Sequence, residues 1–303
     1  MKAMILAAGM GERLRPLTNI YPKVLVPVVN TPVLDRIIQF ITTHGVEKII
    51  INAHHHCQMI RDYLQEGNPF GVKVEIRIEK EILGTGGGIK NTQDFWGTDP
   101  FIVINGDILT DIDLGDVYEF HMKKNHLVTM VLHDFPQYNK VRVDKEMNIL
   151  SIGPGTNVKS TLAFTGIHVI NPEVLRFIPD KKRYNIIDAY KRLIDLKKPI
   201  RGYIATDHRW IDIGTIADYL QANFYYLPSG NTAIDQNCSI DSSATLKDWA
   251  VIGKRSSIGR TSIVQRSVVW NDVIIKEGVR VVDSVVASGV VVEKDLIGGV
   301  AIR

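Results

Sequence analysis

Residues 6–27 read L-A-A-G-M-G-E-R-L-R-P-L-T-N-I-Y-P-K-V-L-V-P, and this stretch is the most informative part of the chain. The apolar run that ends at Leu6 leads directly into Ala7-Ala8-Gly9-Met10-Gly11, which predicts a strand followed by a loop almost without side chains. Such a loop lets backbone N–H groups approach an anion. Arg13 and Lys23 follow it, and both are cations that can neutralise a polyphosphate.

Two familiar phosphate-binding loops are excluded by the spacing. A dinucleotide-binding loop has the pattern G-x-G-x-x-G, but here Gly9-Met10-Gly11 is followed by Glu12-Arg13-Leu14. A Walker loop needs G-K-[ST] after its second glycine, and that tripeptide is missing at this place. The loop therefore indicates another kind of phosphate chemistry.

The pattern A-A-G-x-G-x-R-L-x-P-L-T, followed by P-K-x-L-x-P-V, closely resembles the signature of the sugar-1-phosphate nucleotidyltransferases. These enzymes join a nucleoside triphosphate to a sugar 1-phosphate and release pyrophosphate. The resemblance implies that Arg13 holds the triphosphate and that Lys23 contacts the reacting phosphates. It also implies that the loop binds the nucleotide through Leu6, Ala7, Ala8, Gly9 and Gly11.

Composition and charge limit the possible partners. The chain has 303 residues, 45% of them hydrophobic, and a formal net charge of +3. This length predicts two domains, and the small charge favours neither nucleic acid nor a membrane surface as a partner. No apolar run reaches the length of a membrane span, and the apolar N-terminus is too short for a signal peptide. Cys57 and Cys238 do not form a disulfide framework, so a cytoplasmic location is expected.

The first 225 or so residues alternate strand-like and helix-like patterns, which predicts a doubly wound, mostly parallel α/β sheet of the Rossmann-like type. Ligands of such sheets bind beyond the carboxyl ends of the strands. The predicted strands cover residues 3–8, 48–53, 73–78, 101–105, 127–132 and 164–170. The predicted helices cover residues 32–44, 56–65, 89–95, 114–124 and 216–226.

A second domain is expected after the linker Leu227-Pro228-Ser229-Gly230-Asn231. Aliphatic residues then recur every six positions from Ile240 to Val264, which is typical of a left-handed parallel β-helix, although the register blurs after Trp270. A β-sandwich is the alternative. The expected domains are residues 1–228, which should stay folded and active alone, and residues 232–303. Surplus valines predict that the β-helix covers either the catalytic domain or a second copy in a homo-oligomer. These valines are Val268, Val269, Val285, Val286 and Val290–Val292.

A second glycine cluster, Leu83-Gly84-Thr85-Gly86-Gly87-Gly88-Ile89, permits close approach of a flat ligand or presents N–H donors at a helix start. The resemblance implies that Gly84, Thr85 and Gly86 line the pocket of the nucleotide base. Glu79 precedes the cluster, and its carboxylate would suit guanine or uracil equally, unless it is only a solvated charge. The nucleotide therefore stays open between GTP and UTP.

Polyphosphate chemistry needs Mg²⁺, which prefers one or two carboxylates together with phosphate oxygens and water. Asp107 follows a predicted buried strand, and Asp212 lies in W-I-D-I-G-T. The alternative for Asp212 is a place in the N-cap region of the helix over residues 216–226, although Thr215 could serve as that cap instead. The resemblance assigns the metal to Asp107 and Asp212, with Asp107 also catalytic. It implies sugar contacts from Asn105, Thr165 and Gly166. His54-His55-His56 cannot all converge on one ion from a regular strand or helix, so zinc is not expected.

One departure from the family pattern concerns the sugar phosphate. Many relatives have a Glu-Lys-Pro tract before the T-G-I strand, and residues 140–160 contain none, so Arg142 and Lys159 are the alternatives. The glycine cluster looks most like N-acetylmuramate 1-phosphate uridylyltransferases, and the hexad tail looks more like mannose-1-phosphate guanylyltransferases. A silent regulatory subunit is disfavoured because Arg13, Lys23 and both aspartates are present. An acyltransferase β-helix is disfavoured because no histidine follows His208.

Overall fold

The computed structural model describes residues 1–65, 70–123, 126–153 and 161–303. Contacts between residues divide the chain into two bodies. The first body contains residues 1–10 and 36–210, and the second contains residues 11–35 and 211–303. The sequence-based boundary at residue 228 separates parts of the chain that are expected to fold independently, and this stays a prediction. Helix α1 (Val33–Thr43) and strand β13 (Trp210–Asp212) contain the points of division.

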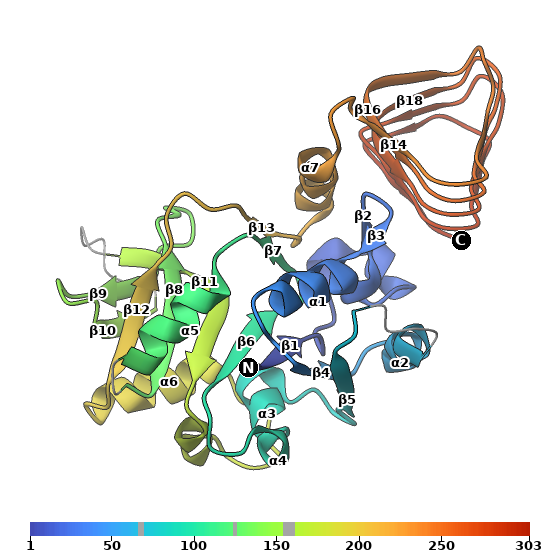
Figure 1. Cartoon of the computed structure of the whole chain (residues 1–303). Coiled ribbons are helices and arrows are strands. Elements are labelled where there is room, and N and C mark those ends of the chain that lie inside the picture. Colours follow the sequence, from blue (N-terminus) through green and yellow to red (C-terminus); the bar gives the residue numbers. More distant parts are fainter. Residues whose placement is uncertain (66–69, 124–125, 154–160) are drawn as a thin grey trace. The chain divides into compact units, whose positions relative to one another are not determined.

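The first body is built on a nine-stranded sheet, whose main path runs β10-β9-β11-β6-β1-β4-β5, with β8 between β11 and β12 (Figure 1). Strands β6, β1, β4 and β5 are parallel neighbours, and β8 and β12 are parallel to each other. Only β11 runs antiparallel to both β6 and β8. The strands of this body are β1 (Lys2–Leu6), β4 (Lys48–Ala53), β5 (Lys73–Ile78), β6 (Phe101–Asn105), β7 (Ile108–Thr110), β8 (Val128–His133), β9 (Val141–Val143), β10 (Ile149–Ile152), β11 (Thr161–Ile170) and β12 (Ile200–Ile204).

Helices cover this sheet because its strands are apolar on both faces, as expected for parallel strands. Residues of α3, α4 and α6 join alternate strand residues such as Met4 and Val103 in one buried cluster. Trp96 stacks on Phe101 inside it, with ring centroids 3.7 Å apart. Helix α5 packs on β8 and β11. The helices are α2 (Cys57–Gln65), α3 (Gly84–Lys90), α4 (Gln93–Trp96), α5 (Leu114–Lys123) and α6 (Ile186–Asp195), with a 3-10 helix at Pro172–Phe177.

The mixed, mostly parallel sheet confirms the predicted fold class, and three predicted strands have the observed bounds. The helix predicted over residues 89–95 is wrong at its start, because α3 begins at Gly84 and includes the glycines. Glycine-rich stretches disfavour helix on propensity alone. The hairpin β9–β10, the helix α6 and the strand β12 were not predicted.

Burial sets the charge state of several histidines in the first body. His168 is 1% exposed and hydrogen-bonds the Tyr190 hydroxyl. Burial lowers the pKa of His168 to about 3. Burial, with a smaller contribution from His126, also lowers the pKa of His121 to about 4. These imidazoles are therefore neutral in the folded protein at neutral pH.

This burial predicts acid sensitivity. Below pH of about 6.5 the unfolded chain binds a proton at His168 that the folded chain does not bind. The free energy of unfolding therefore decreases as the pH is lowered. The slope for this one group approaches about 1.4 kcal/mol per pH unit, down to the folded pKa of about 3. His168→Gln keeps a partner for the Tyr190 hydroxyl but does not titrate. Denaturant unfolding at about pH 7, 6 and 5 should show a shallower pH dependence for the variant, and equal slopes would contradict the assignment.

The second body joins residues 11–35, helix α7 (Ile216–Tyr226) and a C-terminal stack of short parallel strands (Figure 1). The stack is consistent with the predicted left-handed β-helix. Its strands are β14 (Thr232–Ile234), β15 (Ser239–Ile240), β16 (Thr245–Ile252), β17 (Ser257–Ile258), β18 (Ile263–Val269), β19 (Ile274–Ile275), β20 (Arg280–Val282), β21 (Val285–Val286), β22 (Val291–Val292), β23 (Leu296–Ile297) and β24 (Val300–Ala301). Residues 11–35 form 3-10 helices at Glu12–Leu14, Leu17–Asn19 and Lys23–Leu25 and the hairpin β2 (Pro27–Val28) and β3 (Thr31–Pro32).

The hexad spacing is explained by the register of the coils. Leu246 pairs with Val264 eighteen residues later, but Ile252 pairs with Val269 only seventeen residues later. The difference arises where Asp248 and Trp249 of one coil lie opposite a single residue of the next. The spacing between successive inward-facing residues therefore falls from six to five between Val264 and Val269. The sequence predicted that the six-residue repeat is lost after Trp270, and the structure shows that it is first interrupted before that residue.

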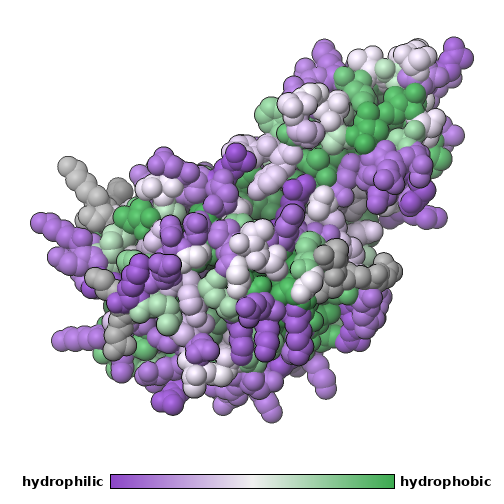
Figure 2. All heavy atoms as spheres, viewed as in Figure 1, coloured by the Kyte–Doolittle hydropathy of each residue, from purple (hydrophilic) through white to green (hydrophobic). Residues whose placement is uncertain are grey.

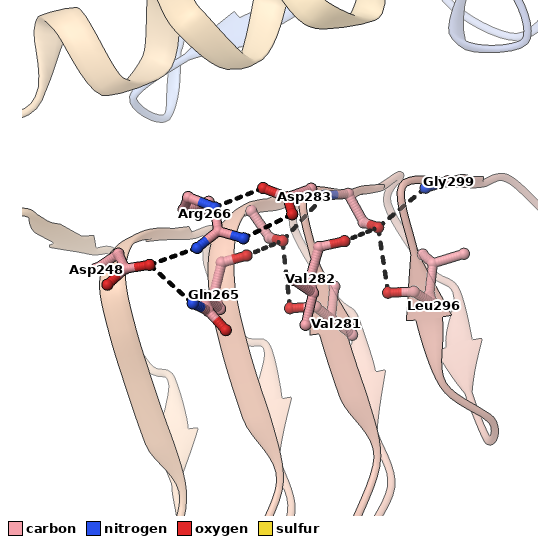
Figure 3. A network of polar contacts seen from close by, with 10 residues as sticks. Asp248, Gln265, Arg266, Val281, Val282, Asp283, Leu296 and Gly299 are labelled. Atoms are coloured by element: carbon pink, nitrogen blue, oxygen red, sulfur yellow. Dashed lines mark hydrogen bonds and ion pairs between the residues drawn. The ribbon is translucent and has the colours of Figure 1, made fainter.

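Polar side chains connect successive coils at this corner (Figure 3). The Arg266 guanidinium bonds Asp283 of the next coil at 2.6 and 2.7 Å and Asp248 of the preceding coil at 2.5 Å. These bonds raise the pKa of Arg266 and lower the pKa of Asp283. Beneath them the buried Ser267 hydroxyl donates to the Gln265 carbonyl and accepts from the Ser284 amide. The serine thus satisfies backbone groups where the coil shortens.

Most of the surplus valines are buried inside the β-helix body. Val268 and Val285 are 1% and 0% exposed, so they offer no free surface to a partner. Helix α7 contacts β16 and β18. Exposed apolar side chains of the β-helix include Ile274 and Val291, which are neighbours in register, and Figure 2 shows apolar surface on the visible face of the β-helix. Among the described residues, no helix is long and apolar enough to cross a membrane.

Candidate active site

The register of three parallel strands places their polar ends at one level of the first body. Leu6 of β1 pairs with Asn52 of β4 on one side and with Asn105 of β6 on the other. A cavity of ≈ 220 Å³ lies beyond these carboxyl ends, as expected for an open α/β sheet. It is lined by Leu6, Ala8, Gly9, Asn52, Ile82, Gly84, Thr85, Asn105 and Asp107. The structure therefore brings together predicted nucleotide, sugar and metal residues of the first body.

The side-chain amide of Asn52 joins the two glycine segments. Its Oδ1 accepts from the Ala7 amide at 2.8 Å, and its Nδ2 donates to Glu79 Oε1 at 2.7 Å. Glu79 Oε2 accepts from the Leu83 amide at 2.9 Å. Glu79 is 3% exposed, so it is not a solvated charge. Both its oxygens have internal donors, and contact of Glu79 with a base stays a prediction.

The glycines of α3 allow this helix to approach another chain segment closely. The amides of Gly86 and Gly87 both donate to the Tyr184 carbonyl, at 2.9 and 3.1 Å. A Cβ on Gly87 would lie 2.5 Å from the Lys182 carbonyl oxygen, and a Cβ on Gly88 would lie 2.7 Å from Asn52 and Glu79. These glycines therefore serve packing within the protein, whereas Gly84 and Thr85 line the cavity.

The predicted sugar residues lie where β6 and β11 meet. Gly166 has φ of +81°, and a Cβ there would lie 2.6 Å from Asn105 Nδ2, so the glycine makes room for the Asn105 amide. Thr165 is buried and its hydroxyl donates to the Val131 carbonyl at 2.9 Å. The Trp210 indole donates to the Thr165 carbonyl at 2.8 Å. Contact of these residues with a sugar stays a prediction.

The second body holds the predicted phosphate-binding cations. Arg13 Nη2 lies 3.4 Å from Asp212 Oδ2, and Lys23 Nζ lies 3.9 Å from Asp212 Oδ1. Both separations are longer than a charge-assisted hydrogen bond, and the Arg13 side chain is 59% exposed. A Cβ on Gly214 would lie 2.8 Å from Arg13 Nη1, so this glycine packs against the guanidinium. A carboxylate between two cations can orient both of them toward an anionic ligand.

Thr215, not Asp212, caps helix α7. The Thr215 hydroxyl accepts from the Asp218 amide, and the Asp218 carboxylate accepts from the Thr215 amide, which completes a capping box. The cap is therefore supplied by Thr215, and the alternative role of Asp212 as the cap is wrong. The Asp212 carboxylate is not used as a cap and instead lies near Arg13 and Lys23.

The remaining candidates have other surroundings. His54 donates from Nδ1 to the Glu79 carbonyl at 2.8 Å. Arg142 lies in β9, opposite Thr161 of β11, and Lys159 lies outside the described residues. Sequence reasoning missed the Asn52–Glu79 bridge, for which the only signal was the position of Asn52 at a strand end, and it missed the packing of Arg13 on Gly214.

The Asn52–Glu79 bridge predicts a strong coupling. Asn52→Asp replaces the donor with a second carboxylate against buried Glu79, and it should lower the free energy of unfolding by about 2–3 kcal/mol. Glu79→Gln in the same chain supplies a new donor while its amide oxygen can still accept from Leu83. Denaturant unfolding of wild type, both single variants and the double variant measures this coupling. Strictly additive losses would show that the bridge does not exist.

Comparisons with known proteins agree with this geometry. The nucleotidyl transferase family model matches residues 2–228. A UTP–glucose-1-phosphate uridylyltransferase of Synechocystis sp. is 34% identical over 242 residues, which cover 73% of this chain and 62% of that protein. The chain thus spans less than two thirds of the length of that relative. A mannose-1-phosphate guanylyltransferase of Mycobacterium tuberculosis is 27% identical over 293 residues, covering 91% of this chain and 81% of that protein.

A solved structure extends the comparison to the fold. The crystal structure of HddC from Yersinia pseudotuberculosis complexed with GMP-PN superposes with a TM-score of 0.64 at 26% sequence identity. The match covers 75% of this chain and 99% of that chain. The family and the relatives named above are sugar-1-phosphate nucleotidyltransferases, and this confirms the family resemblance drawn from the glycine loop.

Proposed function

This chain belongs to the nucleotidyl transferase family, and we propose that it transfers a nucleotidyl group from UTP or GTP to a sugar 1-phosphate with release of pyrophosphate. The observation that carries the proposal is the cavity at the carboxyl ends of β1, β4 and β6, which is lined by the glycine loop, Asn105 and Asp107. Relatives named for uridylyl and guanylyl transfer support the choice of nucleotides.

The reaction needs positioning and charge neutralisation more than acid–base chemistry. A sugar-1-phosphate oxygen attacks the α-phosphorus of the nucleotide, the new P–O bond forms, and the bond to the β-phosphate breaks to release pyrophosphate. The attacking phosphate is already an anion, so no general base is required. The protein then gains its rate from holding two anions together and neutralising charge that develops in the transition state.

The residues of both bodies have roles in this proposal. Ala8 and Gly9 of the loop, with Gly84 and Thr85, bind the nucleotide in the cavity of the first body. Asn105 and Gly166 bind the sugar. Thr165 supports this part of the site, because it is buried with its hydroxyl bonded to Val131 and its carbonyl to Trp210. Arg13 holds the outer phosphates, and Lys23 stabilises charge at the α-phosphate.

The donor set fits Mg²⁺. Among the described residues, no group of three or more His, Cys, Asp or Glu side chains could form a complete metal cage. Mg²⁺ usually takes one or two carboxylates together with substrate phosphates and water, so Asp107 and Asp212 suffice if they meet at one ion. When bound, Mg²⁺ would neutralise phosphate charge. Asp212 also orients Arg13 and Lys23, whose atoms lie 3.4 and 3.9 Å from it.

The alternatives are less well supported. A silent regulatory subunit would have no need for Arg13, Lys23, Asp107 and Asp212 together. Self-association through the β-helix is part of our proposal, and its support now rests on exposed side chains such as Ile274 and Val291 instead of the buried valines.

The substrates can be assigned by assaying pyrophosphate release for each nucleoside triphosphate against a panel of sugar 1-phosphates. With the active pair, Lys23→Ala should reduce turnover at least about a hundredfold, because loss of a charge partner of the transition state costs about 3 kcal/mol. Exposed Lys276→Ala, on the β-helix of the same body, is the matched control and should retain turnover. Wild-type turnover of folded Lys23→Ala would remove Lys23 from the mechanism.

Activity should require Mg²⁺ or Mn²⁺. Asp107→Asn and Asp212→Asn should each raise the metal concentration for half-maximal rate at least about tenfold, since each removes one charged ligand. The metal concentration for half-maximal rate is measured by titrating the metal at saturating nucleotide. Asp111→Asn, whose carboxylate pairs with Arg209 at 3.3 Å, is the control. An unchanged metal requirement in either site variant would exclude that aspartate as a ligand.

A further inference from the structure

Residues 11–35 carry Gly11, Arg13 and Lys23, and their contacts group them with the β-helix. The tail was expected from sequence to be separable from catalysis. The contacts within the second body indicate a closer connection, which runs through one tryptophan of the β-helix.

Trp270 follows β18 and is 2% exposed, but it is not a member of the aliphatic cluster inside the coils. Its backbone is fixed in the coil stack, because its amide donates to the Val286 carbonyl at 2.8 Å and its carbonyl accepts from the Ser256 hydroxyl at 2.8 Å. Its indole instead contacts two tyrosines, Tyr21 and Tyr219. A large side chain is thus held rigidly by the β-helix and directed to residues outside it.

Tyr21 lies two residues before Lys23. Its ring meets the Trp270 indole edge to face, with centroids 5.2 Å apart and an interplanar angle of 76°. Such aromatic pairs contribute beyond the area that they bury. Lys23 begins a short 3-10 helix directly after Tyr21 and Pro22, so the contact of the Tyr21 ring with Trp270 lies next to the start of this helix.

A second contact passes through helix α7. The Trp270 Nε1–H donates to the Tyr219 hydroxyl at 2.9 Å, and that hydroxyl donates to the Pro27 carbonyl at 2.5 Å. Tyr219 is fully buried, and burial raises its pKa, so the hydroxyl stays protonated and able to donate. Tyr21 and Pro27 flank Lys23 in the sequence, and both are connected to the Trp270 indole, Tyr21 directly and Pro27 through Tyr219.

Further hydrogen bonds fix the hairpin that follows. The Val29 amide donates to Asn223 Oδ1 at 2.8 Å, and Asn30 Nδ2 donates to the Ile252 carbonyl of β16 at 3.0 Å. A Cβ on Gly11 would lie 2.7 Å from Thr18 Cγ2 and 3.5 Å from Lys23 Cβ, so the end of the glycine loop lies close to both residues. The segment is thus held by the β-helix and α7 along much of its length.

We propose that Trp270 is a positioning residue, which holds Lys23 in the geometry needed for nucleotidyl transfer through Tyr21 and through the Tyr219–Pro27 contact. This inference rests on the proposed function of Lys23. It replaces the expectation that a chain ending at Pro228 stays fully active, because such a chain lacks Trp270.

The test uses the full-length protein. Trp270→Ala should lower kcat at least about tenfold with a smaller change in KM for the nucleotide, and Trp270→Phe, which keeps an aromatic contact for Tyr21, should recover part of the loss. Ile258→Val removes a methylene group from the core of the β-helix and is the matched control for simple destabilisation. It should leave kcat within about twofold, measured well below the unfolding temperature of every variant.

Coupling to Lys23 separates positioning from a general loss of structure. In a Lys23→Ala background, Trp270→Ala should cause no further loss of kcat, because the group that it positions is gone. Additive losses, wild-type kcat in Trp270→Ala, or an equal loss in Ile258→Val would each overturn the proposal.

Hydrogen–deuterium exchange provides a readout that does not depend on activity. Peptides covering residues 17–30 should exchange faster in Trp270→Ala and not in Ile258→Val. If the wild-type protein transfers no nucleotidyl group, the proposed function fails, while faster exchange in these peptides would still establish the packing role. Unchanged exchange in Trp270→Ala would overturn the inference even in an active enzyme.

Discussion

The site of the first body depends on the hydrogen bonds of the Asn52 amide. One side of this amide holds the Ala7 backbone at the start of the glycine loop, and the other holds buried Glu79. Glu79 in turn holds the Leu83 backbone before the second glycine segment. Because a buried carboxylate needs donors on its oxygens, these contacts fix both segments around one cavity. The cavity is therefore shaped before any ligand enters it.

The groups that we propose to neutralise phosphate charge belong to the second body. Arg13 and Lys23 share Asp212, and the segment that contains them packs on α7 and on Trp270 of the β-helix. The corner residues and buried serines of the β-helix hold its coils together, and Trp270 links this stack to the segment that contains Lys23. In our proposal the tail contributes to the reaction by positioning Lys23, without a reactive group of its own.

Local sequence patterns were sufficient for six of the nine strands in the sheet of the first body and for the glycine loop after β1. Apolar runs such as residues 48–53 and 101–105 are readable because they are buried on both faces. The helix at Gly84 was missed because its glycines are required by contacts with residues 182–186, about a hundred positions away. The five-residue step at Val269 and the outward indole of Trp270 likewise depend on register between coils. Such long-range constraints leave no local signal in a single sequence.

The central claim is that the cavity of the first body and the cations of the second act on the same triphosphate. A crystal structure of the full chain with Mg²⁺, a sugar 1-phosphate and a non-hydrolysable analogue of the assigned nucleotide tests it directly. The account predicts the base beside Gly84 and Thr85, Lys23 and Arg13 in contact with the phosphates, and carboxylate oxygens of Asp107 and Asp212 each about 2.1 Å from one ion. A triphosphate bound away from Lys23, or the two carboxylates more than about 6 Å apart with the ion bound, would contradict it.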